Sequence, residues 1–377
     1  MISFPPFRKY YFIAWIVIYI LGLCAWFCEI CPNYFFIVVE IYILAFFGLN
    51  LYYSLSSRNH PEKIHHPEFF INEILLAATY LGLVIYLPFI FPRSLGEDLW
   101  RFIYFNLWNS LSIHQLCWVI YIKVARQNNR KKHRMLLYSE WVNLVKEIHA
   151  SKDEKAHNFT RKLMHFGISA GLILIYYCGP LFIQLPVFSQ LGITSDLFVK
   201  YWWFAICLHL LWMLNLADLF RLQSFSDLGR FATRWLESSI RNHEFYTFTS
   251  APLMIISWFP FLLASQLIFI IIALNGSVSD ALASIFGKKY GKVRDIRGKT
   301  KIGYIAGFVS TFILTFLGIL IFLPSISVNS SIGWIFMISL ICGIAFFMID
   351  RFTTIVSDNF LIPLVVGIIL WIFIILS

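Results

Sequence analysis

Ten long apolar runs limit what this chain can fold into more than any other feature of its sequence. A helix that crosses a bilayer needs about 20 mostly apolar residues, and most of the runs are close to that length. Inside lipid, backbone N–H and C=O groups must bond within the segment, so such runs cross as helices. The runs are Tyr10–Cys28, Tyr34–Tyr53, Ile74–Pro92, Leu99–Ile122, Leu163–Ile183, Tyr201–Phe220, Ala251–Phe286, Ile302–Leu323, Gly333–Ile349 and Phe360–Leu376. The sequence therefore predicts an all-α polytopic membrane helix bundle.

Composition supports the same class. Hydrophobic residues make up 59% of the 377 residues, and charged residues only 13%. Soluble domains are about 45–50% apolar and about 25% charged, so the composition excludes the soluble class. It also excludes an intrinsically disordered chain, which needs a polar and charge-rich composition. We expect membrane lipids as partners and no nucleic acid.

The run Ala251–Phe286 is too long for one crossing. Its 36 residues would extend about 54 Å as a single helix, against a hydrocarbon core of about 30 Å. Pro260 lies inside the run and is the expected break point, because proline removes a helical hydrogen bond. With two passes or a re-entrant pair there, the prediction is about eleven transmembrane helices.

Positive charges give the expected orientation, because short loops rich in Lys and Arg stay cytoplasmic. Lys123–Lys162 and Lys288–Lys301 are basic, whereas Cys178–Lys200 and Pro324–Gly333 carry almost no charge. We therefore expect an integral, multi-pass protein with its N-terminus inside and its C-terminus outside. In this orientation most ionisable residues of the later spans lie on the cytoplasmic side, and charges near spans usually mark a site or a pathway.

The charge distribution predicts three stretches. Residues 1–122 form an N-terminal four-helix membrane unit of unassigned role, 123–160 a basic cytoplasmic linker, and 161–377 the membrane domain with the candidate site. The shorter linker Ser54–Asn72 is polar, and its three histidines are expected to be solvated.

Asp280 lies in an apolar run just before a glycine-containing basic loop. A carboxylate in such a run needs a basic partner or a cation such as Mg²⁺. Gly287 and Gly291 expose backbone N–H groups, and seven basic residues lie between Lys288 and Lys301. Such a loop could hold several phosphates. The alternative is a positive-inside anchor that contacts anionic lipid headgroups.

Asp350 and the Asp358–Asn359 pair form a second candidate group. Two or three carboxylates beside a polyphosphate loop are what Mg²⁺-dependent phosphoryl transfer requires. Asp358 and Asn359 could instead cap the last helix, because their side-chain oxygens can accept unpaired N–H groups.

Arg161, Lys162 and His165 form a third group at the start of a predicted span. Arg161 and His165 are four residues apart, so a helix would present both on one face. The histidine could accept a hydroxyl proton or orient a phosphate. An interfacial cluster that positions the helix at the headgroups is the alternative. His243–Glu244 could polarise a nucleophile, but such a loop pair is more often ordinary surface.

Four short motifs, in order over roughly residues 155–377, resemble those of the integral-membrane CTP-dependent lipid kinases. That family includes dolichol kinase, phytol kinase and the CTP-using diacylglycerol kinase, and it is distantly similar to phosphatidate cytidylyltransferase. The matching residues are Arg161, Lys162 and His165; Asp280, Ala281, Ala283, Gly287 and Gly291; Lys299, Thr300, Lys301 and Gly303; and Asp350, Asp358, Asn359 and Pro363. The chain differs from the family pattern at Ser279 (usually Gly), Ile302 (usually Glu), Tyr304 (usually Ser or Thr) and Asp350 (usually Glu).

The resemblance implies transfer of a phosphoryl group from CTP or another nucleoside triphosphate to a lipid alcohol at the cytoplasmic face. The lipid alcohol would be a polyprenol, phytol or diacylglycerol, and Mg²⁺ would be the cofactor. The implied catalytic residues are His165, Asp280 and Asp358. The implied nucleotide and phosphate ligands are Arg161, Lys162, Lys288, Lys292, Arg297, Lys299 and Lys301. The implied metal ligands are Asp280, Asp350, Asp358 and Asn359.

Two alternatives stay open. A phosphatidate cytidylyltransferase making CDP-diacylglycerol would use similar acids and bases but release pyrophosphate. A non-catalytic lipid carrier is the second alternative, and Ile302 in place of the usual glutamate favours it.

Overall fold

The computed structural model describes residues 7–28, 34–131, 137–150, 154–241, 244–293, 295, 299–322 and 331–376. Within these ranges the regular elements are helices. The elements up to residue 193 are α1 (Phe7–Cys28), α2 (Tyr34–Ser56), α3 (Pro61–His65), α4 (Pro67–Ile90), η1 (Arg93–Leu95), α5 (Glu97–Lys131), α6 (Tyr138–Ala150), α7 (Glu154–Phe182) and α8 (Pro186–Gln190). The later elements are α9 (Ser195–Gln223), η2 (Phe225–Asp227), α10 (Arg230–Ser239), α11 (Ser250–Ile256), α12 (Phe261–Ala264), α13 (Gln266–Leu274), η4 (Asn275–Ser279), α14 (Asp280–Tyr290), α15 (Lys301–Phe322), α16 (Ile332–Phe352) and α17 (Asp358–Leu376).

Seven helical segments of the described residues are long and apolar enough to cross a membrane. They are Phe35–Ser56, Pro67–Leu95, Ser195–Gln223, Gln266–Tyr290, Lys301–Phe322, Ile332–Phe352 and Asp358–Leu376. Three shorter apolar segments are Tyr11–Cys24, Phe166–Phe182 and Ser250–Ala264. The predicted all-α class is confirmed over this part of the chain. The count of about eleven spans stays a prediction.

The long run Ala251–Phe286 is interrupted, as its length requires. Residues 257–260 form turns, and Pro260 directly precedes the short helix α12. Ser265 then takes an extended conformation, with φ −172° and ψ 146°, and its side chain accepts the Leu267 N–H at 3.2 Å. A serine in this conformation ends one helix and caps the next. Whether the run crosses the membrane twice stays a prediction.

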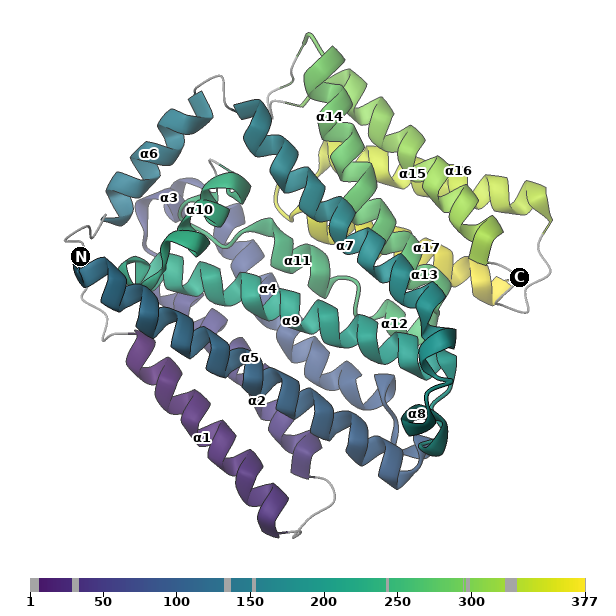
Figure 1. Ribbon diagram of the computed structural model, residues 1–377. Coiled ribbons are helices and arrows are strands. Elements are labelled where there is room, and N and C mark those ends of the chain that lie inside the picture. Colours follow the sequence, from purple (N-terminus) through teal and green to yellow (C-terminus); the bar gives the residue numbers. More distant parts are fainter. Residues whose placement is uncertain are drawn as a thin grey trace. The chain divides into compact units, whose positions relative to one another are not determined.

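The chain divides into two compact units. The first comprises residues 1–161, 186–193 and 205–252, and the second comprises 162–185, 194–204 and 253–377. In the first unit α2 packs against α1, α4 and α5 (Figure 1). The predicted roles of residues 1–122, 123–160 and 161–377 stay predictions.

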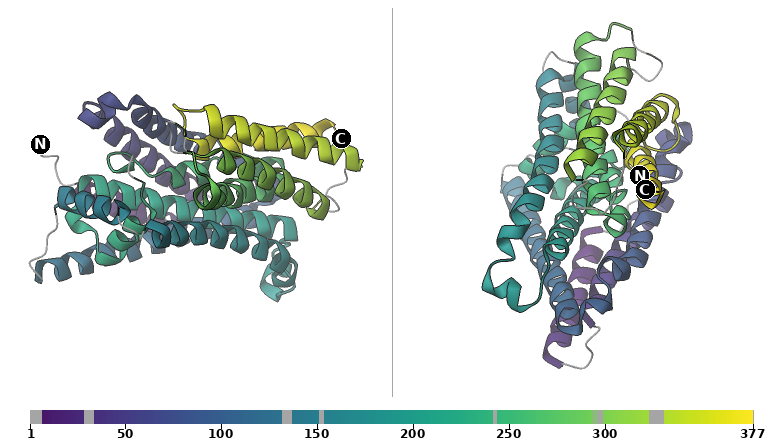
Figure 2. Two further views of the ribbon diagram at one scale, coloured as in Figure 1. Left: turned by 90° about the horizontal axis from the view of Figure 1, so that it is seen from above. Right: turned by 90° about the vertical axis from the view of Figure 1, so that its right-hand side faces the viewer.

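In the second unit α15 packs against α13, η4, α14 and α16, while α17 packs against α13, η4 and α16. The last two helices, yellow in Figure 2, lie against each other in both views. Glycine allows the closest contact of α15 and α16, because a Cβ on Gly307 would lie 2.2 Å from the Phe346 ring. Small residues at helix contacts are how membrane helices approach closely in the absence of a hydrophobic driving force. The second unit contains the residues of the candidate site described next.

Candidate functional site

The helix that carries Asp280 is irregular just before that residue. Residues Asn275–Ser279 form a π-helical turn, η4, between α13 and α14. The buried Asn275 amide donates to Thr315 Oγ1 on α15 at 3.0 Å, and Ser279 Oγ donates to Asn275 Oδ1 at 3.3 Å. Single π-helical turns are frequent at functional sites, because they change the direction in which the following side chains project.

Thr300 closes the basic loop at its end. Its buried hydroxyl donates to the Gly287 carbonyl at 3.2 Å and accepts the Gly303 N–H at 3.1 Å. The two helices are so close here that a Cβ on Gly287 would lie 3.1 Å from the Gly303 Cα. The glycines are therefore needed for the contact of α14 with α15, and Thr300 fixes the loop to that contact.

Replacing Gly291 with alanine should destabilise the contact that Thr300 makes between α14 and α15. The new Cβ would lie 2.4 Å from Thr300 Oγ1 and 2.5 Å from the Gly287 carbonyl oxygen, which is a backbone atom. Overpacking of this kind costs about 1–3 kcal/mol in the free energy of unfolding, measurable by denaturant unfolding in detergent. The matched control is Gly333→Ala, where no heavy atom lies within 4 Å of the new Cβ. Equal stability of the two variants would contradict this account of the closure.

Lys299, just before α15, joins two carboxylates from elsewhere in the chain. Its Nζ donates to Asp350 Oδ1 at 2.5 Å and to Asp358 Oδ2 at 2.6 Å. Asp350 lies near the end of α16 with 7% of its surface exposed, and Asp358 begins α17. We call Lys299, Asp350 and Asp358 the lysine–carboxylate cluster.

The charge state of this lysine follows from its partners. Burial opposes the ammonium form, but Asp358 and Asp350 more than offset it and raise the pKa of Lys299 above its ordinary value. A lysine with a raised pKa contributes its stabilisation below the ordinary pKa and loses it only as pH rises through the folded-state value. Lys299 is therefore charged throughout the neutral range.

Lys299 also keeps donor capacity. An ammonium group has three N–H donors. The two carboxylate bonds use two of them among the described residues, and 34% of the Lys299 side chain is exposed. The third N–H can therefore donate to an incoming anion without breaking the cluster.

Asp280 lies close enough to the cluster for its charge to repel that of Asp350. Asp350 therefore experiences the negative charge of both Asp358 and Asp280. No group of three potential metal ligands occurs among the described residues, and Lys299 supplies the cation between Asp350 and Asp358. In this arrangement the residues do not form a ready-made Mg²⁺ site, so Mg²⁺ stays a prediction from the sequence.

The other predicted site residues lie in three settings. Lys288 near the end of α14, Lys292 just after that helix and Lys301 at the start of α15 are exposed, and Asn359 is buried, with its N–H accepted by Asp358 Oδ1 at 2.8 Å. Asp358 thus bonds the first turn of α17 with one oxygen and Lys299 with the other. The backbones of Arg161, Lys162 and His165 belong to α7, but their side chains lie outside the described residues. Arg297 and His243 also lie outside them.

Sequence reasoning missed Asp295, which organises the basic loop. Its carboxylate accepts the Lys299 backbone N–H at 3.0 Å and the Tyr304 hydroxyl, and its own N–H donates to the Lys299 carbonyl at 2.8 Å. Tyr304 stands where the resembled family has Ser or Thr, and that departure was the signal available for finding this contact. The pair holds the backbone of Lys299 in place at the start of α15.

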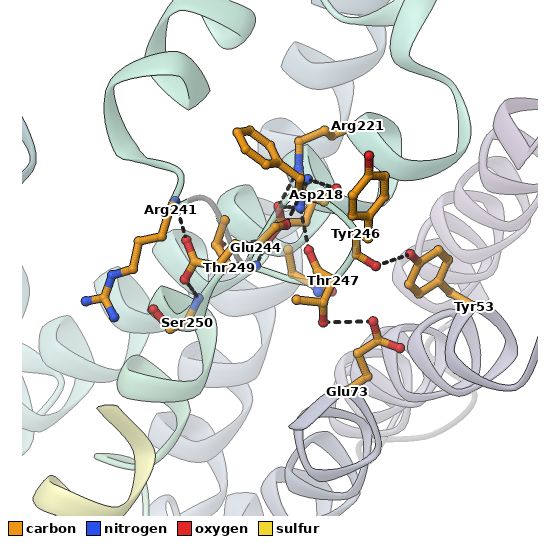
Figure 3. Close-up of polar contacts among 12 residues, drawn as sticks. Tyr53, Glu73, Asp218, Arg221, Arg241, Glu244, Tyr246, Thr247, Thr249 and Ser250 are labelled. Carbon is orange, nitrogen blue, oxygen red and sulfur yellow. Dashed lines mark hydrogen bonds and ion pairs between the residues drawn. The ribbon is translucent and has the colours of Figure 1, made fainter. Parts of the chain in front are cut away.

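A second buried network lies in the first unit, around Arg221 (Figure 3). Arg221 and Asp218 are both fully buried on α9, and the guanidinium donates to Asp218 Oδ1 at 2.8 and 3.0 Å. Arg221 also donates to the carbonyls of Glu244, Phe245 and Thr247 at 3.2, 2.9 and 2.6 Å. One arginine therefore donates to three carbonyls of the loop before α11.

Acidic side chains complete this network. Glu244 accepts the backbone N–H groups of Arg241 and Ser250, each at 2.9 Å (Figure 3). Glu73 on α4 accepts the Thr247 hydroxyl at 2.8 Å and the Lys63 ammonium at 2.6 Å. Burial lowers the pKa of Lys63, while Glu73 acts in the opposite direction.

The network around Arg221 therefore has a structural explanation. Buried polar groups must be paired, and here the charged side chains bind loop backbone and one another. It holds the segment of residues 244–249 to α9 and α4.

No family model, curated protein or solved structure matches this chain. Its chemistry must therefore be inferred from its own residues. The lysine–carboxylate cluster, with Asp280 nearby and exposed lysines on both adjoining helix ends, can bind an anion and orient it against carboxylates.

Proposed function

We propose that the chain transfers the γ-phosphoryl group of a nucleoside triphosphate, CTP by resemblance, to the hydroxyl of a lipid alcohol at the cytoplasmic membrane face. The observation that carries the proposal is the lysine–carboxylate cluster. Its three residues come from the basic loop, the end of α16 and the start of α17, which are the segments with the resembling motifs. A buried or half-buried charge cluster at the end of a membrane helix is a functional candidate by default.

In the proposed reaction the lipid hydroxyl oxygen attacks the γ-phosphorus. A new P–O bond forms to the lipid, the bond to the β,γ-bridging oxygen breaks, and the nucleoside diphosphate leaves. The hydroxyl proton passes to His165, our candidate base. Catalysis of phosphoryl transfer consists mainly of positioning and of stabilising charge on the transferred group.

In the proposal, different residues bind the phosphates, position the binding lysine and hold the metal ion. Lys299 donates its third N–H to a phosphate oxygen, while Asp350 and Asp358 fix its position. The exposed Lys288, Lys292 and Lys301 attract the polyphosphate. Asp280 and Asp358 are the proposed carboxylates for a Mg²⁺ ion arriving with the nucleotide, which would neutralise phosphate charge when bound.

The proposed orientation follows from the positive charges of the loops. The basic loop before α15 faces the cytoplasm, where soluble nucleotide is available, and the lipid alcohol reaches the site from the bilayer. This orientation requires about eleven spans in the proposal. The run that contains Pro260 must then cross the membrane twice or re-enter it.

The test uses purified protein in lipid nanodiscs with Mg²⁺, CTP, and a mixture of dolichol, phytol and diacylglycerol. The expected result is stoichiometric formation of CDP and one phosphorylated lipid. Asp280→Asn should lower the rate about 100-fold or more, the usual effect of removing one electrostatic contact to a transition state. The matched control Asp196→Asn, in an exposed 3.0 Å pair with Lys200, should retain activity.

Two outcomes would contradict the proposal. Pyrophosphate release on addition of phosphatidic acid would identify a cytidylyltransferase. Formation of neither product with any nucleotide would leave the non-catalytic lipid carrier as the better account.

A further inference from the structure

An apolar groove lies between α14 and α15, with a volume of about 420 Å³. This volume falls within the range of about 300–1,000 Å³ typical of ligand pockets. Its lining is apolar except for Ser310, and several of its residues, including Ile302 and Val309, are exposed. The lining residues are Leu282, Phe286, Ile302, Ile305, Ala306, Val309, Ser310, Ile313 and Leu314.

A second apolar groove lies between α15 and α16. Its volume is about 240 Å³, and it is lined by Ile305, Phe308, Ile344 and Phe347. Ile305, which is 58% exposed, lines both grooves. Two hydrocarbon chains that diverge from one headgroup could therefore lie on either side of this residue.

The larger groove has a length that limits its occupant. Its α15 residues extend from Ile302 to Leu314, about 18 Å along the helix. Half of a hydrocarbon core of about 30 Å is about 15 Å, so the groove is about one leaflet deep. That depth matches an acyl chain, whereas a long polyprenol would extend far beyond it.

Charge near the start of the grooves complements a phosphate. Lys301 directly precedes the groove residue Ile302, and Lys288 and Lys289 follow the groove residue Phe286 within one helical turn. All three lysines are exposed. A lipid whose chains occupy the grooves would thus have its headgroup among cations and a few residues from Lys299.

We propose that the larger groove holds one acyl chain of a diacylglycerol acceptor, and that the smaller groove, which spans one turn of α15 from Ile305 to Phe308, holds the adjoining part of the other chain, with Ile305 between them. That this lipid is the phosphoryl acceptor rests on the proposed function. Among the three candidate acceptors, the inference selects the two-chain glycerolipid over the single-chain polyprenol and phytol. The product phosphatidic acid then meets Lys301, Lys288 and Lys289.

The test has a binding arm and an activity arm. A photoactivatable diacylglycerol in nanodiscs should label α14–α16, and Ala306→Phe, which fills the larger groove, should lower both labelling and kcat/KM for diacylglycerol about tenfold. The matched control is Ala78→Phe on the exposed face of α4, which should change neither. In competition at equal mole fraction, the wild-type protein should phosphorylate diacylglycerol in preference to dolichol and phytol.

The outcomes separate the two proposals. Phosphorylation of dolichol or phytol in preference to diacylglycerol, with Ala306→Phe fully active, would overturn the groove assignment and leave the kinase proposal standing. Groove-specific labelling without phosphorylation of any lipid would overturn the kinase proposal and leave two-chain lipid binding. Equal labelling by a single-chain probe, unaffected by Ala306→Phe, would show ordinary bilayer contact and overturn the inference.

Discussion

Replacing Lys299 with methionine is expected to lower lipid phosphorylation at least about 100-fold, the scale seen when one electrostatic contact to a transition state is lost. Methionine keeps an unbranched side chain but removes the ammonium that bonds Asp350 and Asp358. Two carboxylates would then lie together without their cation, so both phosphate binding and the positions of the acids would suffer. The measurement is the rate of CDP formation in nanodiscs with the lipid acceptor.

Two comparisons separate a functional from a structural effect of this change. Lys200→Met removes a single, more exposed ion pair to Asp196 on α9, at 3.0 Å, and should leave the rate unchanged. The double variant Lys299→Met with Asp350→Asn removes one of the unpaired charges and should recover thermal stability without recovering activity. Recovery of both would show that Lys299 acts only by holding the fold, which contradicts its proposed contact with phosphate.

Replacing Arg221 with methionine is expected to destabilise the protein by about 3–5 kcal/mol, the usual result of leaving one charge of a buried pair uncompensated. The change leaves Asp218 buried without its guanidinium and removes the Arg221 donor from the carbonyls of Phe245 and Thr247. Each unpaired buried group adds a desolvation cost. The measurement is denaturant unfolding in detergent.

The matched control is Arg101→Met. Arg101 pairs with Glu97 at 2.6 Å, but both side chains are about half exposed, so the loss should be at most about 1 kcal/mol. Adding Asp218→Leu to Arg221→Met removes the buried carboxylate that has lost its cation, although Asp218 still accepts two bonds from Thr249, and should recover part of the lost stability. If the free energy of unfolding of Arg221→Met lies within about 1 kcal/mol of the wild-type value, the network does not hold the loop before α11 in place, and this account is contradicted.

The all-α fold class and the interruption of the run Ala251–Phe286 could both be predicted from the sequence. Apolar runs near the length of a membrane helix have few ways to satisfy their backbone, so the helices follow from composition alone. The interruption before α12 follows from a run that is too long and contains Pro260. The sequence predicts Asp350 and Asp358 as carboxylates beside a phosphate-binding loop, but the salt bridges that both make to Lys299 depend on the packing of α15, α16 and α17.

The first unit was harder to predict because burial of its charges depends on tertiary partners. Lys63 lies in a polar linker that is expected to be solvated, yet it is 3% exposed because it reaches the buried Glu73 on α4. Asp218 and Arg221 lie at the end of the apolar run Tyr201–Phe220, but nothing local in the sequence indicates that Arg221 binds loop carbonyls more than 20 residues later. Such contacts carry no sequence periodicity.

The most direct test of the central claim is the fate of labelled phosphorus. Purified protein in nanodiscs is given Mg²⁺ and CTP labelled either at the α- or at the γ-phosphorus, together with diacylglycerol, dolichol or phytol in separate reactions, and the label in the extracted lipid is counted. Phosphoryl transfer predicts that γ-label enters the lipid and α-label stays in CDP. Entry of α-label into lipid, or of neither label with any of the three lipid alcohols, would contradict the account.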